Sequence, residues 1–162
     1  MIVVDVETTG INPQSHSIVS IGAVDFFHPA NTFYSECNIF DGAEVSEKAL
    51  EINGFSLVAI TDRNKLSLEQ AIKKYLEWTS TVSQKTIAGE NPTFDRDFLR
   101  ASAERYGIAW PLGRRVVDLH SVSYAVHLGA MFEAEAFSRL FYGKVLLSQF
   151  DKFPIPDYLQ KR

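Results

Sequence analysis

Two carboxylates stand two residues apart near the start of the chain, at the end of an apolar run. The opening sequence MIVVDVETTG predicts a strand over residues 2–7 that carries Asp5 and Glu7. Side chains alternate across a strand, so both acids point to the same face, with Cα atoms roughly 6.5–7 Å apart. They repel each other unless positive charge lies between them, and both can reach a hard cation or a pair of cations. The spacing therefore predicts a metal site.

A plainer interpretation is that both acids are solvated at the end of a strand. The apolar residues 2–4 disfavour it, because they are typical of a strand buried on both faces, where an unpaired acid is costly. Thr8, Thr9 and Gly10 follow directly and predict a polar turn at the edge of the sheet. Sheet-based functional sites tend to lie at such an edge.

A third carboxylate lies near the middle of the chain. Asn91 and Pro92 predict the start of a helix, with a capping side chain followed by proline at the first helical position. Asp95 shares a face with Phe98 and so points inward toward the sheet, whereas Asp97 points away. An inward carboxylate needs a partner. The alternative is an acid stabilised by the helix dipole, which suits Asp97 and stays open for Asp95.

Together, Asp5, Glu7 and Asp95 offer oxygen ligands from two elements, a donor set that suits Mg²⁺ or Mn²⁺. Two such ions about 3.5–4 Å apart form the arrangement used for in-line phosphoryl displacement. One ion then activates a water and the other stabilises the leaving 3′ oxygen. Residues 8–10 can offer hydroxyl and N–H groups to a terminal nucleotide, and Phe94 either stacks on a base or belongs to the core.

The pattern along the chain predicts an α/β fold that positions these acids. Three early strands separated by turns at 12–13 and 28–31 indicate an antiparallel meander, and the later alternation of helix and strand indicates a mixed five-stranded sheet flanked by helices. Strands are expected at 2–7, 17–27, 31–40, 86–88 and 115–118, and helices at 46–52, 67–79 and 93–106, with further helices to about residue 142.

The composition bounds the protein class. A chain of 162 residues predicts one domain, residues 1–162, with no apolar run of transmembrane length and no signal-peptide pattern. The single cysteine, Cys37, excludes an internal disulfide and favours a reduced, cytoplasmic setting. The net charge of −4 argues against a protein that grips long duplexes by electrostatics alone.

Residues 5–10 and 91–99 resemble the first two motifs of the DEDD-type 3′–5′ exonucleases, which include the proofreading epsilon subunit of DNA polymerase III, ribonuclease T and oligoribonuclease. The order and spacing of further matching segments extend the resemblance over roughly residues 1–120. It implies a ribonuclease H-like fold and two divalent ions, Mg²⁺ or Mn²⁺, held by Asp5, Glu7 and Asp95. It also implies single-stranded DNA or RNA 3′ ends as substrate, and makes Asp118 a structural acid.

The third motif of that family is not found. The family places a His five residues before an Asp, or a Tyr four residues before an Asp, in its last helix, and neither spacing follows His120, Tyr124 or His127. One interpretation is that a segment is missing near residues 127–129, with the general base inside it. In that interpretation Gly129 stands in the Asp position at the end of the third motif. Glu133 and Glu135 are weak candidates as substitute acids, since helix acids are usually solvated.

Three functions compete. The leading hypothesis is a metal-dependent 3′–5′ exonuclease. The second is a catalytically weak or inactive nuclease-fold module that binds nucleic acid or a protein partner, which the absent third motif favours. A haloacid-dehalogenase-type phosphatase also opens with a strand and paired acids, but its second acid is Asp, and an early antiparallel meander does not fit its doubly wound sheet.

Overall fold

The computed structural model describes residues 1–128 and divides the chain into two compact units. The first unit, Met1–Leu119, carries the sheet and the predicted acids, and the second begins at His120. Residues 120–128 of the second unit are helical. Gly129, Glu133 and Glu135, which the sequence offered for the third motif, lie outside the described residues. The single-domain interpretation of residues 1–162 stays a prediction.

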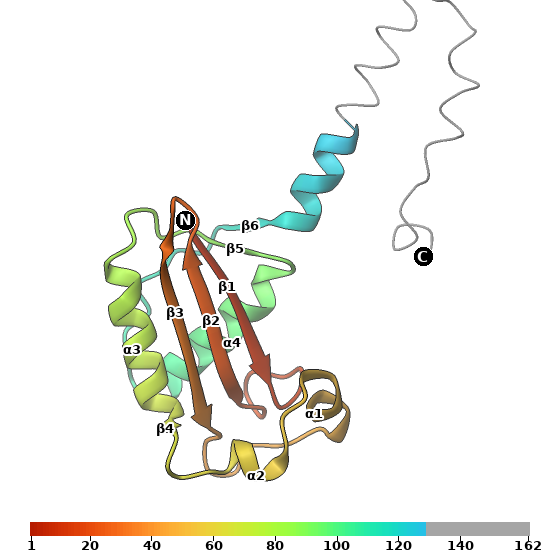
Figure 1. The fold of residues 1–162 in the computed structure, drawn as a ribbon, viewed down its shortest axis with the longest axis vertical. Helices are drawn as coiled ribbons and strands as arrows, with labels where there is room; N and C mark the ends of the chain where they lie inside the picture. Colours follow the sequence, from red (N-terminus) through yellow and green to blue (C-terminus); the bar gives the residue numbers. More distant parts are fainter. Residues whose placement is uncertain (129–162) are drawn as a thin grey trace, which may run out of the picture. The chain divides into compact units, whose positions relative to one another are not determined.

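Six strands form the sheet of the first unit, in the order β4-β3-β2-β1-β5-β6 (Figure 1). Strands β1, β2 and β3 are antiparallel neighbours, and β5 and β6 continue the sheet parallel to β1. This confirms the predicted α/β architecture with its early meander. The strands are β1 (Ile2–Thr8), β2 (Ile18–Asp25), β3 (His28–Asn38), β4 (Leu66–Ser67), β5 (Ile87–Gly89) and β6 (Val116–Asp118).

Two details of the sheet differ from the prediction. The sixth strand, β4, is only two residues long and pairs with the end of β3, which is too short for a periodic pattern in the sequence. The β2–β3 turn lies at Phe26 and Phe27 rather than at residues 28–31. The Asp25 carboxylate accepts a hydrogen bond from the Phe27 N–H at 3.1 Å, so an Asx turn, not the proline that follows, ends β2.

Four helices in the first unit begin at residues with good capping chemistry or proline. The Ser46 hydroxyl accepts from the Ala49 N–H, and Gly54 ends the same helix in the left-handed region at φ 75°, as the sequence predicts. Ser67 and Gln70 form a capping box. The helices are α1 (Glu47–Asn53), α2 (Leu57–Ile60), α3 (Leu68–Ser80) and α4 (Pro92–Arg105).

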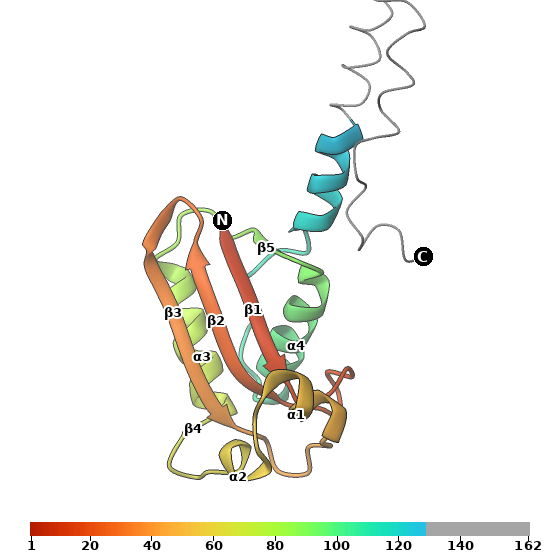
Figure 2. The same cartoon turned by 45° about the vertical axis from the view of Figure 1, so that its right-hand side comes forward.

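Helices α3 and α4 cover one face of the sheet, and α1 lies at the end of β1 (Figures 1 and 2). Their apolar faces bury Tyr75 and Phe98 against the sheet. Along β1, Ile2, Val4 and Val6 point into this core, whereas the residues between them point to the other face. The fold therefore places the acids of β1 on the face that the two long helices leave open. None of the helices in the described part of the chain is both long and apolar enough to cross a bilayer.

Gly89, the last residue of β5, allows β5 to approach β1 closely. A Cβ at this position would lie 3.0 Å from the Val4 carbonyl oxygen, a backbone atom that cannot rotate away. We expect Gly89→Ala to lower the free energy of unfolding by about 1–3 kcal/mol, the usual cost of overpacking. Urea denaturation measures it. Gly113→Ala is the matched control, since a Cβ there meets nothing within 4 Å, and an equal loss in both variants would contradict the explanation.

Candidate active site

Asp5 and Glu7 lie on the same face of β1, as their spacing predicts. Asp5 is exposed and Glu7 is half-buried, while Val6 between them is buried on the helix side. Across β2, Asp5 pairs with Gly22 and Glu7 pairs with Ser20, so small residues flank both carboxylates. Burial raises the pKa of Glu7, and the negative charge of Asp5 raises it further. The two carboxylates therefore interact electrostatically.

Asp95 points inward from the first turns of α4 and is only 3% exposed, as predicted. Its Oδ1 accepts a hydrogen bond of 2.9 Å from the Val6 N–H. This bond is possible because β5 pairs with β1 only at Ile2 and Val3, which leaves the β1 backbone open further along. The inward acid thus has a backbone partner on the very strand that carries the other two acids.

The pKa of Asp95 is raised to about 6, mainly by burial and also by the charges of Asp5 and Glu7, while hydrogen bonds from backbone N–H groups, that of Val6 first, act to lower it. The three predicted acids therefore form one electrostatic group. They do not form a closed set of ligands: among residues 1–128, no three His, Cys, Asp or Glu side chains converge closely enough to hold a metal ion. That Asp5, Glu7 and Asp95 together hold metal ions stays a prediction.

The donor chemistry of this group nevertheless fits a divalent cation. All three groups are carboxylates, and burial together with neighbouring negative charge raises the pKa of Glu7 and of Asp95, so the ionised form of these two acids is disfavoured without a compensating positive charge. A hard cation bound by oxygen ligands is the usual way to neutralise such charge.

The start of α4 departs from the predicted cap. Asn91 has φ 52° in the left-handed region, and its side chain makes no capping hydrogen bond. Its backbone N–H instead donates to Asp118 Oδ1 at 3.3 Å, at the end of β6. This long-range contact ties the start of α4 to the end of β6.

The turn after β1 is held by its own hydroxyls. Thr8 Oγ1 donates to the Gly10 carbonyl at 2.7 Å, and the fully buried Thr9 donates to the Glu44 carbonyl at 2.6 Å. The Asn53 side chain of α1 donates to the Thr8 carbonyl. These hydroxyls have internal partners, so their role in substrate binding stays a prediction, while their role in shaping the turn is direct.

Gly10 in this turn lies against a histidine that the sequence analysis did not single out. A Cβ at Gly10 would lie 2.0 Å from His16 Cδ2, so the imidazole occupies the space that a side chain would need. His16 is largely buried, and its Nε2 lies 3.9 Å from Glu44 Oε2. The glycine of the motif is therefore required by packing in the loop.

Phe94 packs on Phe98 with ring centroids 4.8 Å apart and is partly buried against the core. Of the two interpretations of this residue, the structure favours the core one. In the second unit, His120, Tyr124 and His127 lie in the helical stretch described for it.

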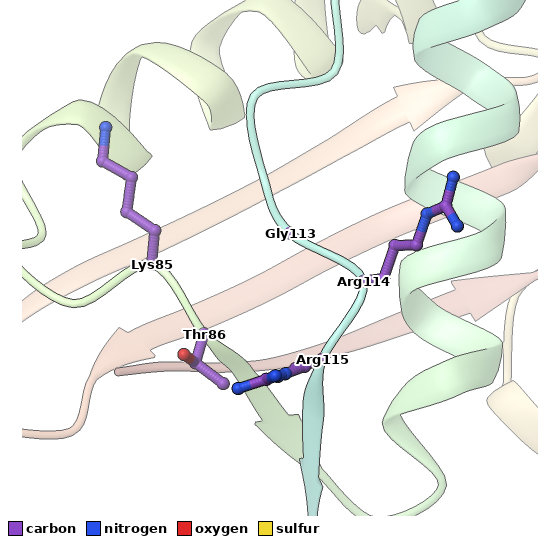
Figure 3. A pocket seen from close by; sticks show the side chains of 5 residues that line it. All are labelled: Lys85, Thr86, Gly113, Arg114 and Arg115. Atoms are coloured by element: carbon purple, nitrogen blue, oxygen red, sulfur yellow. The ribbon is translucent and has the colours of Figure 1, made fainter.

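A hollow with basic residues lies away from the acids, where β5 and β6 begin. Lys85, Thr86, Gly113, Arg114 and Arg115 line it. Figure 3 shows Arg115 lying across it toward Thr86, while the side chains of Lys85 and Arg114 diverge. None of the three predicted acids lines this hollow, so it is not the metal site that the sequence predicts.

Comparison with solved structures defines the class of protein. The chain superposes on Escherichia coli exonuclease I in complex with a dT13 oligonucleotide with TM-score 0.65 at 20% identity, covering 78% of this chain and 29% of that one. It superposes on the nuclease domain of 3′hExo, a DEDDh family member, bound to rAMP, with TM-score 0.58 at 16% identity, covering 74% and 66%. The fold is that of the 3′–5′ exonucleases, and the chain spans under a third of exonuclease I.

A family model described as the 3′–5′ exoribonuclease Rv2179c-like domain matches residues 1–126, and the chain belongs to this family. Ribonuclease T of Vibrio vulnificus is 30% identical over 161 residues, covering 91% of this chain and 68% of the relative. Ribonuclease T of Vibrio parahaemolyticus is 29% identical, covering 91% and 69%. These relatives confirm the DEDD-type 3′–5′ exonuclease resemblance.

The contact between Gly10 and His16 makes a testable pair. We expect Gly10→Ala to lower the free energy of unfolding by about 1–3 kcal/mol through overpacking, because the new methyl collides with the imidazole. The double variant Gly10→Ala with His16→Ala should recover most of the loss, since it removes the collision. Urea denaturation of the four proteins in the cycle measures the coupling. Strict additivity would contradict the contact.

The raised pKa of Asp95 predicts a pH-dependent stability difference. The folded state holds the Asp95 proton more tightly than the unfolded state, so the stability from protonated Asp95 is complete below about pH 4 and is lost as pH rises through about 6. With EDTA present, Asp95→Asn should match wild type at pH 4 and be more stable at pH 8 by roughly 1–3 kcal/mol. Chemical denaturation across pH measures this difference. A variant less stable than wild type at pH 8 would contradict it.

Proposed function

We propose that Asp5, Glu7 and Asp95 hold two divalent ions and that the protein removes nucleotides from the 3′ ends of single-stranded RNA. The observation that carries the proposal is the hydrogen bond that the buried Asp95 accepts from the N–H of Val6, the residue between Asp5 and Glu7 on β1. Membership of an exoribonuclease family and the ribonuclease T relatives support RNA as the substrate. DNA remains the comparison substrate, because exonuclease I shares the fold and is solved with dT13.

In this proposal, the role of each acid and of the turn at residues 8–10 follows from its position. Asp5 and Glu7 would hold the ions on the open face of β1, and Asp95 would hold one from the α4 side. Mg²⁺ or Mn²⁺, when bound, supplies Lewis acidity that activates water and stabilises the leaving 3′ oxygen. The turn at residues 8–10 would receive the terminal nucleotide, since it lies directly beyond the two acids of β1. A reduced, cytoplasmic setting belongs to this proposal, supported by the single, buried Cys37.

A second candidate is a nuclease-fold module that binds nucleic acid or a protein without turnover. Two observations favour it. The sequence has no third motif at the family's spacing after His120, Tyr124 or His127. The acids of residues 1–128 also do not converge as a finished metal site.

Degradation of a 5′-labelled single-stranded oligonucleotide separates the two candidates. RNA and DNA are incubated in parallel with Mn²⁺, Mg²⁺ or EDTA, using the full chain. We expect a metal-dependent ladder that shortens from the 3′ end. Asp5→Ala and Asp95→Ala should each lower the rate at least about a hundredfold, since a bound metal supplies several kcal/mol of charge stabilisation.

Asp97→Ala is the matched control on the same helix. Asp97 is about half exposed and pairs with Arg96, so we expect its removal to leave the rate within about twofold, as for other exposed ion pairs. Full activity of Asp5→Ala would contradict the site. No cleavage by wild type, with Mn²⁺ still raising its melting temperature and Asp95→Ala abolishing that rise, would favour the binding module.

A further inference from the structure

Asp5 belongs to a row of residues that crosses three strands and ends at an exposed aromatic ring. Asp5 pairs with Gly22 of β2, and Gly22 pairs with Tyr34 of β3, so the three residues point to the same face. Neighbouring strands lie about 4.8 Å apart, which sets Asp5 and Tyr34 about 9.6 Å apart at Cα. The three strands run side by side in both views (Figures 1 and 2).

Directly opposite the two acids, β2 carries small residues on this face. Ser20 lies opposite Glu7, and Gly22 lies opposite Asp5. A Cβ at Gly22 would meet only the Asp5 carbonyl oxygen, at 3.9 Å, so open space lies above it. Between Asp5 and Tyr34, therefore, no side chain of β2 stands in the way of a flat group.

Tyr34 is exposed and yet held in place. It is 67% exposed, and its hydroxyl donates to Glu36 Oε1 at 3.0 Å. The Lys65 ammonium holds the other carboxylate oxygen of Glu36, so the ring is tied at its far end. Burial, the bond to Glu36 and the charges of Glu36 and Glu7 raise the pKa of Tyr34, which places Glu7 within electrostatic reach of the ring. A fixed ring loses little conformational freedom when a ligand stacks on it.

We propose that Tyr34 is a substrate-binding residue that stacks on the base of the penultimate nucleotide of the bound strand. The inference rests on the proposed function, which puts the scissile phosphate at Asp5 and Glu7. The terminal nucleotide then lies at residues 8–10, beyond the acids. A strand that leaves this point across β2 passes over Gly22 and reaches Tyr34. The base on the 5′ side of the scissile phosphate is therefore the one within reach, and aromatic rings stack on any base.

Three variants test the role of the ring. We expect Tyr34→Leu to raise KM for single-stranded RNA about tenfold with little change in kcat, since base–aromatic stacking is worth roughly five- to 150-fold per base. Tyr34→Phe keeps the ring and should stay within about threefold of wild type. Phe27→Leu is the matched control, because Phe27 is an exposed aromatic residue at the β2–β3 turn, 57% exposed.

Abasic substrates identify the nucleotide involved. With an abasic penultimate position, wild type and Tyr34→Leu should have equal KM, whereas an abasic terminal position should leave their difference intact. Equal KM for the two proteins on intact RNA, or a difference that survives the penultimate abasic site, would overturn the proposal. So would an equal effect of Phe27→Leu.

A binding measurement separates this inference from the proposed function. If wild type does not cleave RNA, the proposed hydrolysis fails, but 2-aminopurine at the penultimate position still reports on stacking. We expect its fluorescence to be quenched on binding to the full chain, and Tyr34→Leu to remove the quenching. Quenching that is equal in wild type and Tyr34→Leu would overturn the inference on its own.

Discussion

The hydrogen bond from the Val6 N–H to the Asp95 carboxylate is the interaction on which the site depends. It joins Val6 of β1 to Asp95 of α4, two residues that lie 89 positions apart in the chain. It thereby fixes the third acid beside the strand that carries the first two. A buried carboxylate is costly without a partner, and this backbone N–H is that partner. The short β5, paired with only the first residues of β1, leaves the amide available.

Burial of Asp95 makes its ionised form unfavourable in the metal-free protein. The pKa of about 6 results from burial and from the repulsion of Asp5 and Glu7, opposed by hydrogen bonds from the backbone N–H groups of Val6 and of Asp95 itself. A fold optimised only for stability would place an apolar or amide side chain at this position. In the proposed function a divalent cation would reverse the balance, because the three repelling carboxylates would become its ligands. The same negative charge that destabilises the metal-free protein would stabilise the metal-bound protein.

The open face of the sheet is the complement of the helix-covered face. Alternation along β1 sends Val4 and Val6 to the core and Asp5 and Glu7 to the other side. The antiparallel meander then extends this face over β2 and β3, where glycine and serine keep it low and Tyr34 stands exposed. Antiparallel sheets commonly have one packed and one solvated face, and the proposed substrate strand would lie on the solvated one.

Much of this could be predicted from the sequence because it depends on local patterns. The strand of residues 2–7 and the common face of Asp5 and Glu7 follow from alternation, and the helix after Ser46 follows from its cap and its terminal Gly54. The inward direction of Asp95 follows from helical spacing to Phe98. The start of α4 at Asn91 and Pro92 was predicted correctly, but the capping hydrogen bond was wrong, because Asn91 takes the left-handed region at φ 52° instead of the extended backbone that a capping residue normally adopts.

The sequence by itself determined which acids the chain has, their spacing along each element, and the face that each takes. Only the tertiary structure decided which backbone group receives Asp95, that His16 fills the space beside Gly10, and that Tyr34 shares a row with Asp5. The physical reason is that periodicity sets direction within one strand or helix. Strand register and helix docking are set by contacts between segments far apart in the chain, which no local pattern encodes.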